Sequence, residues 1–125
     1  MVDDSAPVRT MITTCVSVGV PGVHKILEAE NAVQAIHEWR ERNGNVDLII
    51  TELSFITGAM RGQAMIDFIR MSDPDVPIIV AAVMDEEDIR ISVRGANAVF
   101  PKPFGIAGLM AAVRRSLLSV ERAPK

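Results

Sequence analysis

Four charged residues, placed at three separate points of the sequence, carry the side chains that could act together chemically. Asp3 and Asp4 stand near the amino terminus, Glu52 in the middle and Lys102 towards the end. Carboxylates held close together repel one another unless a hard cation or an ammonium group offsets their charge. Three carboxylates and one lysine therefore predict a Mg²⁺ site with Lys102 as a point charge beside it.

These residues can meet only if the fold brings their segments together, and the sequence pattern indicates such a fold. Short β-branched runs, typical of strands, alternate with stretches of helical period. The runs predict strands over His24–Leu27, Leu48–Thr51, Ile78–Ala82 and Ala98–Phe100, and the stretches predict helices over Pro7–Val18, Ala32–Arg42, Gln63–Met71, Glu86–Arg94 and Ile106–Val120. This alternation is typical of an α/β protein with a doubly wound parallel sheet and helices on both faces.

The charged positions stand where such a fold would gather them. Asp3 and Asp4 precede the first helix, Glu52 closes a strand and Lys102 follows the last strand. Ligands bind at the carboxyl edge of open α/β sheets, so we expect these side chains to converge there. Two alternatives stay open. The acidic pair could serve only the dipole of the first helix, and Glu52 could pair directly with Lys102 and expel the metal.

Composition limits the possible classes of function. The chain has 125 residues, enough for one domain over residues 1–125, and a net charge of −3 that offers no footprint for nucleic acid. No apolar run is long enough to span a bilayer, and the amino terminus lacks the organisation of a secretory signal, so we expect a cytoplasmic protein with no membrane contact. The single cysteine, Cys15, excludes an internal disulfide and a cysteine metal cage.

Five segments in order resemble the receiver domains of bacterial response regulators, of the chemotaxis-regulator type. They are Val2-Asp3-Asp4-Ser5, Glu28-Ala29-Glu30-Asn31, Asp47 to Leu53, Val76 to Val80, and Gly95-Ala96 followed by Lys102-Pro103-Phe104. The resemblance covers nearly the whole chain. It implies a flavodoxin-like fold with strand order 2-1-3-4-5, a role in two-component phosphorelay signalling rather than catalysis, and a histidine kinase or another signalling protein as partner.

The resemblance also implies roles for single residues. Asp3 and Asp4 would help to bind Mg²⁺, and the candidate ligands are Asp3, Asp4, Glu52 and Ser54. The position of Glu52 normally holds an aspartate that takes a phosphoryl group from the kinase. The position of Ala82 normally holds a serine or threonine that binds the phosphoryl oxygen. The position of Val99 normally holds an aromatic residue that reports the switch. Lys102 would pair with the phosphate.

Three of these positions depart from the family pattern. Glu52 is one methylene longer than aspartate, and phosphoryl transfer depends on close positioning of the nucleophile. Ala82 has no hydroxyl and Val99 has no aromatic ring. Together they predict an atypical receiver, or pseudo-receiver, that works without phosphorylation and binds other proteins, including a possible second copy through the face of the fourth helix, last strand and fifth helix.

Two other functions remain as alternatives. In a conventional receiver, Asp3, Asp4 and Lys102 would have the roles given above. Glu52 or Asp47 would then have to accept the phosphoryl group. A flavin- or nucleotide-binding enzyme would need a phosphate-cradling glycine loop after the first strand, and Asp3-Asp4-Ser5-Ala6-Pro7 contains no glycine.

The amino end of the sequence holds little of the family's first strand. That strand lies in the centre of the sheet and precedes the acidic pair, yet only Met1 and Val2 precede Asp3 here. A missing central strand would leave backbone groups of both its neighbours unpaired. We therefore expect the natural protein to start upstream of Met1, with tag residues or a partner chain as the other ways to fill the gap.

Overall fold

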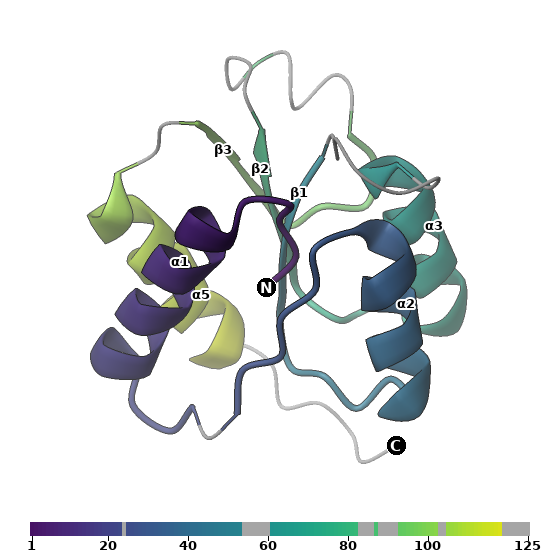
Figure 1. Ribbon diagram of the computed structural model, residues 1–125, viewed down its shortest axis with the longest axis horizontal. Helices are drawn as coiled ribbons and strands as arrows, with labels where there is room; N and C mark the ends of the chain where they lie inside the picture. The colour runs from purple at the N-terminus through teal and green to yellow at the C-terminus, as the bar shows by residue number, and fades with distance from the viewer. Residues whose placement is uncertain (24, 54–60, 83–86, 88–92, 103–104, 119–125) are drawn as a thin grey trace.

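Three parallel strands form the middle layer of the protein (Figure 1). The computed structural model describes residues 1–23, 25–53, 61–82, 87, 93–102 and 105–118. The strands are β1 (Ile49–Glu52), β2 (Ile78–Ala82) and β3 (Ala98–Pro101), in the order β1-β2-β3. Every residue of β1 and β2 is buried, as expected for parallel strands covered on both faces. The carboxyl ends of all three strands therefore share one edge of the sheet.

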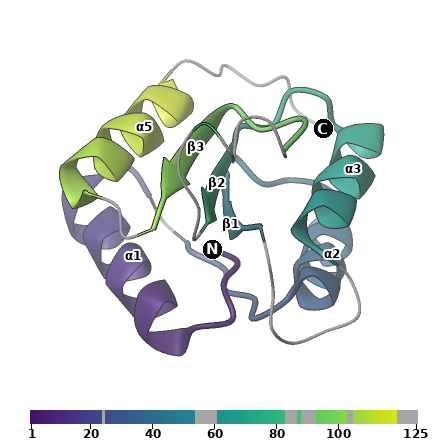
Figure 2. The ribbon, with the colours of Figure 1, turned by 90° about the horizontal axis from the view of Figure 1, so that it is seen from above.

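Helices cover the sheet on both faces, as Figure 2 shows from above. Helices α1 (Ala6–Gly19) and α5 (Ile106–Leu118) lie on one face, and α2 (Ala32–Glu41) and α3 (Gly62–Ser72) lie on the other. Each pair encloses its own apolar core, centred on Ile12 and Val113 on the first face and on Trp39 and Ile66 on the second. The predicted α/β class with helices on both faces is confirmed, and these four helices begin within one residue of their predicted starts.

Local sequence signals explain where the first two helices begin. The Ser5 hydroxyl oxygen accepts a hydrogen bond from the Val8 N–H at 3.3 Å, and the Asn31 side chain accepts one from the Gln34 N–H at 2.9 Å. Such caps satisfy amide groups that have no partner inside the helix. Pro7 in the first turn of α1 needs no such partner. The caps fix the start of α1 directly after the acidic pair.

The amino terminus lies in the sheet beside β1. Val2 forms parallel bridges to Thr51 on one side and to Ala29 on the other. The hydrogen bonds alternate as in a parallel ladder: the Val2 N–H donates to the Ile50 carbonyl and the Glu52 N–H to the Val2 carbonyl, while the Asp3 N–H donates to the Ala29 carbonyl. The order from Ala29 through Val2 to β1, β2 and β3 confirms the predicted order 2-1-3-4-5.

Two of the predicted elements differ or lie outside the described residues. No strand forms over Lys25–Leu27, the described part of the predicted strand His24–Leu27, and pairing is restricted to a bridge at Ala29. The reason is physical, because a strand exists only where a partner pairs with it, and among the described residues only Ala29 in this segment forms a bridge. The predicted helix Glu86–Arg94 lies largely outside the described residues.

A large apolar cavity lies next to Met1, away from the carboxyl edge of the sheet. It has a volume of about 740 Å³. Its lining includes Ile12, Val16 and Val113 from one core and Trp39 and Ile69 from the other.

The Met1 α-amino group lies at the edge of this cavity. It donates a hydrogen bond to the Leu27 carbonyl at 2.8 Å. Burial lowers the pKa of this amino group to about 6, with a smaller opposing contribution from the charge of Glu28. The amino group is therefore mainly neutral at pH 7, and it still donates to the Leu27 carbonyl.

Gly62 provides a test of how α3 is held against the end of β1. A Cβ at Gly62 would lie 2.9 Å from the Glu52 carbonyl oxygen and closer still to that of Leu53. Backbone atoms cannot swing aside, so we expect Gly62→Ala to lower the free energy of unfolding by about 1–3 kcal/mol. In the control Gly108→Ala, the new Cβ would meet Phe100 at an ordinary 3.7 Å and should stabilise α5 by up to about 1 kcal/mol. Equal urea midpoints for the two variants would contradict this account of how α3 packs against the end of β1.

Candidate phosphoacceptor site

Asp3 is the most deeply buried charged residue of the site, with 0% of its surface exposed. One carboxylate oxygen accepts a hydrogen bond from the Ser5 N–H at 2.8 Å, and the other accepts one from the Lys102 ammonium at 2.7 Å. A buried carboxylate is tolerated when it is paired and hydrogen-bonded in this way. Asp3 is therefore held by the turn into α1 on one side and by the end of β3 on the other.

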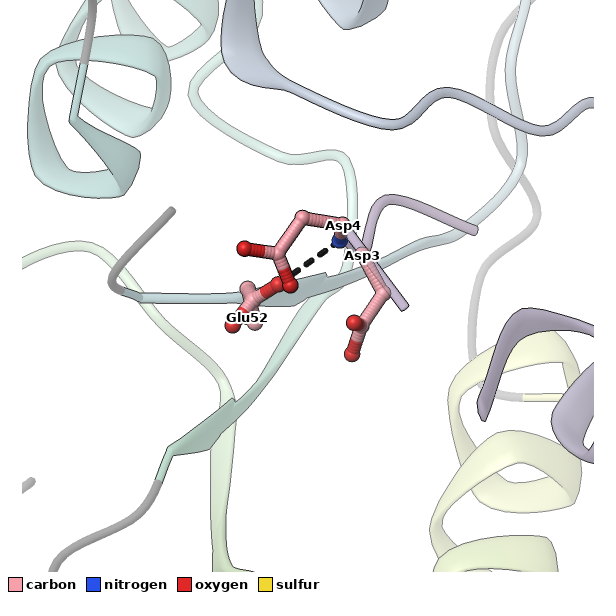
Figure 3. A group of neighbouring side chains, drawn as sticks. All are labelled: Asp3, Asp4 and Glu52. Carbon is pink, nitrogen blue, oxygen red and sulfur yellow. Dashed lines mark hydrogen bonds between the residues drawn. The ribbon is translucent and has the colours of Figure 1, made fainter. Parts of the chain in front are cut away.

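Glu52, the last residue of β1, reaches across to the acidic pair (Figure 3). Its Oε2 atom accepts a hydrogen bond from the Asp4 N–H at 2.8 Å, and its Oε1 atom lies 3.7 Å from the Lys102 Nζ atom. Glu52 is 8% exposed. The longer side chain thus folds back over the backbone of the amino-terminal segment instead of extending from the strand end into solvent.

Lys102 joins the two halves of the site. It follows β3 directly, and its own N–H donates to the Ala82 carbonyl at 2.7 Å, which fixes its backbone beside β2. The ammonium contacts Asp3 closely and Glu52 more loosely, and its side chain is only 16% exposed. One cation therefore balances carboxylates from the beginning and the middle of the chain.

The protonation of Glu52 is shifted strongly. Burial is the largest cause that raises the pKa of Glu52, to about 8, and hydrogen bonding with the Asp4 side chain adds to it. The Asp4 N–H opposes this shift, and the side chain and charge of Asp3 add to it. The Glu52 carboxyl is therefore mainly neutral at pH 7. Its proton reduces the repulsion among three carboxyl groups that share one lysine.

The donor atoms of the site fit a small hard cation. One carboxylate oxygen from each of Asp3, Asp4 and Glu52 can be chosen so that all lie within 4.8 Å of one another. Oxygen ligands of this type suit Mg²⁺, which holds few protein carboxylates and keeps several waters. A cation would have to compete with the Glu52 proton and with Lys102 for the same oxygens.

The structure thus brings together the four charged residues that the sequence singled out. Asp3, Asp4, Glu52 and Lys102 converge at the carboxyl edge, as expected. Ala82 is buried at the end of β2, and Val99 packs partly buried against the core formed with α2 and α3. Ser54, the fourth candidate metal ligand, lies outside the described residues.

Arg9 is a site residue that the sequence reasoning missed. Its Nη1 atom donates to the Asp3 carbonyl at 2.6 Å, and its Nε atom contacts Glu28 at 3.3 Å. The only sequence signal was an arginine in the first turn of the helix that follows the acidic pair. Its contact with Asp3 depends on the turn at Ser5, which folds the helix start back over the strand end.

Comparison with known proteins identifies the fold and the family. Residues 1–114 match the family model of the response regulator receiver domain. This chain belongs to the response regulator receiver domain family. Among curated proteins, none matches the sequence.

Solved structures of receiver domains superimpose well on this one. The receiver domain of NtrX from Brucella abortus has a TM-score of 0.83 at 22% identity, covering 95% of this chain and 97% of that one. The receiver domain protein from Clostridium thermocellum has a TM-score of 0.79 at 18% identity, covering 94% and 91%. In the longer NtrX structure with ADP, with a TM-score of 0.81 at 22% identity, the match covers 94% of this chain but only 26% of that chain. At such low sequence identities, these superpositions establish a shared fold.

Membership of the family gives this site its general meaning. Receiver domains belong to two-component signalling rather than to catalysis, bind Mg²⁺ through acidic residues and interact with histidine kinases and other signalling proteins. In the described part of this chain, Asp3, Asp4 and Glu52 form a cluster of acidic residues. Within the part of the chain that the structure describes, no helix is both long and apolar enough to cross a bilayer.

Lys102→Met should show how much stability depends on the central cation. Removing the ammonium leaves the Asp3 carboxylate buried without its partner, so we expect a loss of about 3–5 kcal/mol at pH 7. Lys25→Met is the matched control, because Lys25 is exposed, and it should change the free energy of unfolding by less than about 0.5 kcal/mol. Equal losses measured by urea denaturation would show that Lys102 does not hold the site together.

Glu52→Gln should change how stability depends on pH. A folded-state pKa of about 8 lies above the unfolded value of 4.5, so folding favours the protonated form. The contribution of Glu52 to the stability of the wild-type protein should therefore be highest below pH 4.5 and should be lost as the pH rises through 8. Glutamine cannot ionise, so at pH 8.5 the variant should exceed the wild type by about 2 kcal/mol, with a smaller gain at pH 5. A gain of the same size at both pH values in thermal denaturation would contradict the raised pKa.

Proposed function

We propose that this receiver domain signals without being phosphorylated and acts through contacts with a partner protein. The observation that carries the proposal is the position of Glu52. Its carboxyl group accepts the Asp4 N–H at 2.8 Å and lies 3.7 Å from the Lys102 ammonium. It thereby occupies the space between Asp4 and Lys102, where a phosphoryl group would need room.

The chemistry of Glu52 also opposes phosphoryl transfer. An acyl phosphate forms when a carboxylate oxygen attacks phosphorus in line, and a neutral carboxyl group is a poor nucleophile. Because burial raises the pKa of Glu52 to about 8, most of it is neutral at pH 7. The hydrogen bond from Asp4 holds one of its oxygens away from the open side of the site.

The two switch positions agree with this proposal. Ala82 has no hydroxyl to follow a phosphoryl group, and its side chain is part of the buried core of the α2–α3 face. Val99 offers an aliphatic side chain, packed against the same core, where the family pattern has an aromatic. A receiver that lacks both groups cannot use them to transmit a change at the site to the surface of the domain.

In this proposal Mg²⁺ would be held by Asp3, Asp4 and Glu52, with Ser54 as a fourth candidate. When bound it would supply positive charge that replaces the Glu52 proton in balancing the carboxylates. Lys102 would remain bonded to Asp3 and orient that carboxylate. The site would then act as a structural centre that keeps α1 and β1 together.

The proposed partner is a histidine kinase or another signalling protein. A second copy of the chain could bind through the face of the fourth helix, last strand and fifth helix, of which the structure describes β3 and α5. In this proposal residues 1–125 form one cytoplasmic receiver domain with no catalytic activity and no contact with nucleic acid or membrane.

Intact mass spectrometry after incubation with acetyl phosphate and Mg²⁺ tests the proposal. We expect the wild-type protein to gain no phosphoryl group. Glu52→Asp shortens the side chain by one methylene and frees the space between Asp4 and Lys102, so we expect it to become phosphorylated. Glu52→Gln is the matched control that restores no nucleophile.

A stable phosphoryl adduct on wild-type Glu52 would overturn the proposal in favour of a conventional phosphoacceptor. An adduct that persists in Glu52→Gln and is lost in Asp47→Asn would assign the phosphoryl group to Asp47. The structure gives that outcome little support, because Asp47 is exposed and precedes β1, at the end of the strand opposite to the site.

A further inference from the structure

Helix α3 begins in contact with the strand end that carries Glu52. The Gly62 N–H donates to the Leu53 carbonyl at 3.0 Å. A Cβ at Gly62 would lie 2.9 Å from the Glu52 carbonyl oxygen, so the first turn of α3 and the end of β1 leave no space between them. Because packed atoms cannot overlap, the strand end cannot shift towards α3 without moving the start of this helix.

Gln63, the next residue of α3, binds the main chain of Arg94. Its Oε1 atom accepts a hydrogen bond from the Arg94 N–H at 3.0 Å, and its Nε2 atom donates to the Arg94 carbonyl at 3.1 Å. The Nε2 atom also donates to the Asp67 side chain at 2.8 Å, which holds the carboxamide in this orientation. One side chain thus binds both main-chain groups of one residue, as a neighbouring strand would. The ion pair of Asp67 with the Arg94 side chain is exposed and adds little.

Arg70, about two turns further along α3, binds the next part of the same segment. Its Nε and Nη2 atoms donate to the Gly95 carbonyl at 3.0 and 2.7 Å, and Nη2 also donates to the Asn97 side chain at 3.0 Å. Asn97 in turn donates its N–H to the Ile78 carbonyl, and its side chain accepts the Ile78 N–H, both at 2.8 Å. Residues 94–97 are therefore attached along α3, and they lead directly into β3 (Figure 1).

These contacts connect the pocket with a remote part of the domain, and they need neither a hydroxyl at Ala82 nor an aromatic ring at Val99. Helix α3 has 11 residues, and its main-chain hydrogen bonds make it move as one unit. Its first turn contacts the strand end at Glu52, and its side chains bind residues 94–97. Coupling between two places in a protein is carried by continuous networks of this kind, which join packed atoms, hydrogen bonds and a rigid helix.

We propose that α3 couples the strand end at Glu52 to residues 94–97, and that Gln63 is the positioning residue that passes a movement of α3 to this segment. A shift of the strand end moves the first turn of α3, and the hydrogen bonds between Gln63 and Arg94 carry the shift to the entrance of β3. By reciprocity, a partner protein that binds at residues 94–97 changes the pocket as much as the pocket changes its affinity. The inference does not depend on whether Glu52 accepts a phosphoryl group.

Hydrogen exchange at the Arg94 amide tests the contact of Gln63 directly. Gln63→Met keeps the length and the helix propensity of the side chain but removes the carboxamide. We expect exchange at Arg94 to become about tenfold faster, because the amide loses this acceptor. The reference is the Val20 amide, which donates to the Val16 carbonyl at the end of α1 on the other face of the sheet. Its exchange rate should not change.

A double-mutant cycle tests the coupling itself. Gly62→Ala forces the first turn of α3 away from the strand end, so exchange at Arg94 should speed up at least about threefold more than exchange at Val20. When Gly62→Ala is combined with Gln63→Met, this additional effect at Arg94 should disappear. A residue that only stabilised the fold would leave the effect of Gly62→Ala unchanged.

Gln34→Met is the matched control for the loss of a carboxamide. Gln34 lies on α2, where its side chain accepts the Glu30 N–H at 3.1 Å and donates to the Glu30 side chain at 3.2 Å. It therefore makes the same kinds of hydrogen bond as Gln63, but on a helix that does not bind residues 94–97. Combined with Gln34→Met, Gly62→Ala should keep its full effect at Arg94.

Glu52→Ala perturbs the same strand end from the side of the pocket, because it removes the side chain that accepts the Asp4 N–H. A response at Arg94 to either perturbation that is lost with Gln63→Met supports the inference. The inference is overturned if Arg94 responds no more than Val20 to both perturbations, or if the response persists with Gln63→Met. Unchanged exchange at Arg94 in Gln63→Met alone would overturn it as well.

Discussion

The contact between Lys102 and Asp3 is the constraint on which the rest of the site depends. A carboxylate with no exposed surface is costly to keep charged, and the ammonium at 2.7 Å makes its burial tolerable. The contact joins residues 99 positions apart, so it forms only when α1, β1 and β3 are already in register. The same ammonium lies within 3.7 Å of Glu52 and shares its charge with a second carboxyl group. Fold and site are therefore stabilised by the same cation.

The raised pKa of Glu52 follows from this arrangement. One lysine cannot balance three carboxyl groups, so the least costly solution is for one of them to keep its proton. Glu52 takes that role because it is buried and because, in its protonated form, its carboxyl group hydrogen-bonds with the side chains of Asp4 and Asp3. In a receiver with an acceptor aspartate, the charge balance would be completed by metal and phosphate. Here a proton on Glu52 can complete the charge balance.

Much of this arrangement could be predicted from the sequence, because it rests on patterns of local origin. Alternating strand and helix periods predicted a parallel sheet with helices on both faces, whose carboxyl edge would gather Asp3, Glu52 and Lys102, and the resemblance to receiver domains implied the strand order. The strand expected at His24–Leu27 did not form in its described part, since a strand is a property of a pair and not of one segment. The roles of Arg9 and Gly62 depend on how the turn at Ser5 and the start of α3 pack against their neighbours. No periodicity in the sequence reports such contacts.

The hydrogen bond between the Asp4 N–H and Glu52 has a consequence for how the pocket can change. Its donor is a main-chain group, which remains whatever side chain stands at position 4, with proline as the exception. Substitutions at Asp4 would thus alter the charge of the pocket but keep the main-chain hydrogen bond to Glu52. Apart from proline at position 4, a change at position 52 is needed to remove this hydrogen bond. Under the proposed function, the loss of one methylene group at position 52 would leave space for a ligand, so the two forms of this receiver would lie one substitution apart.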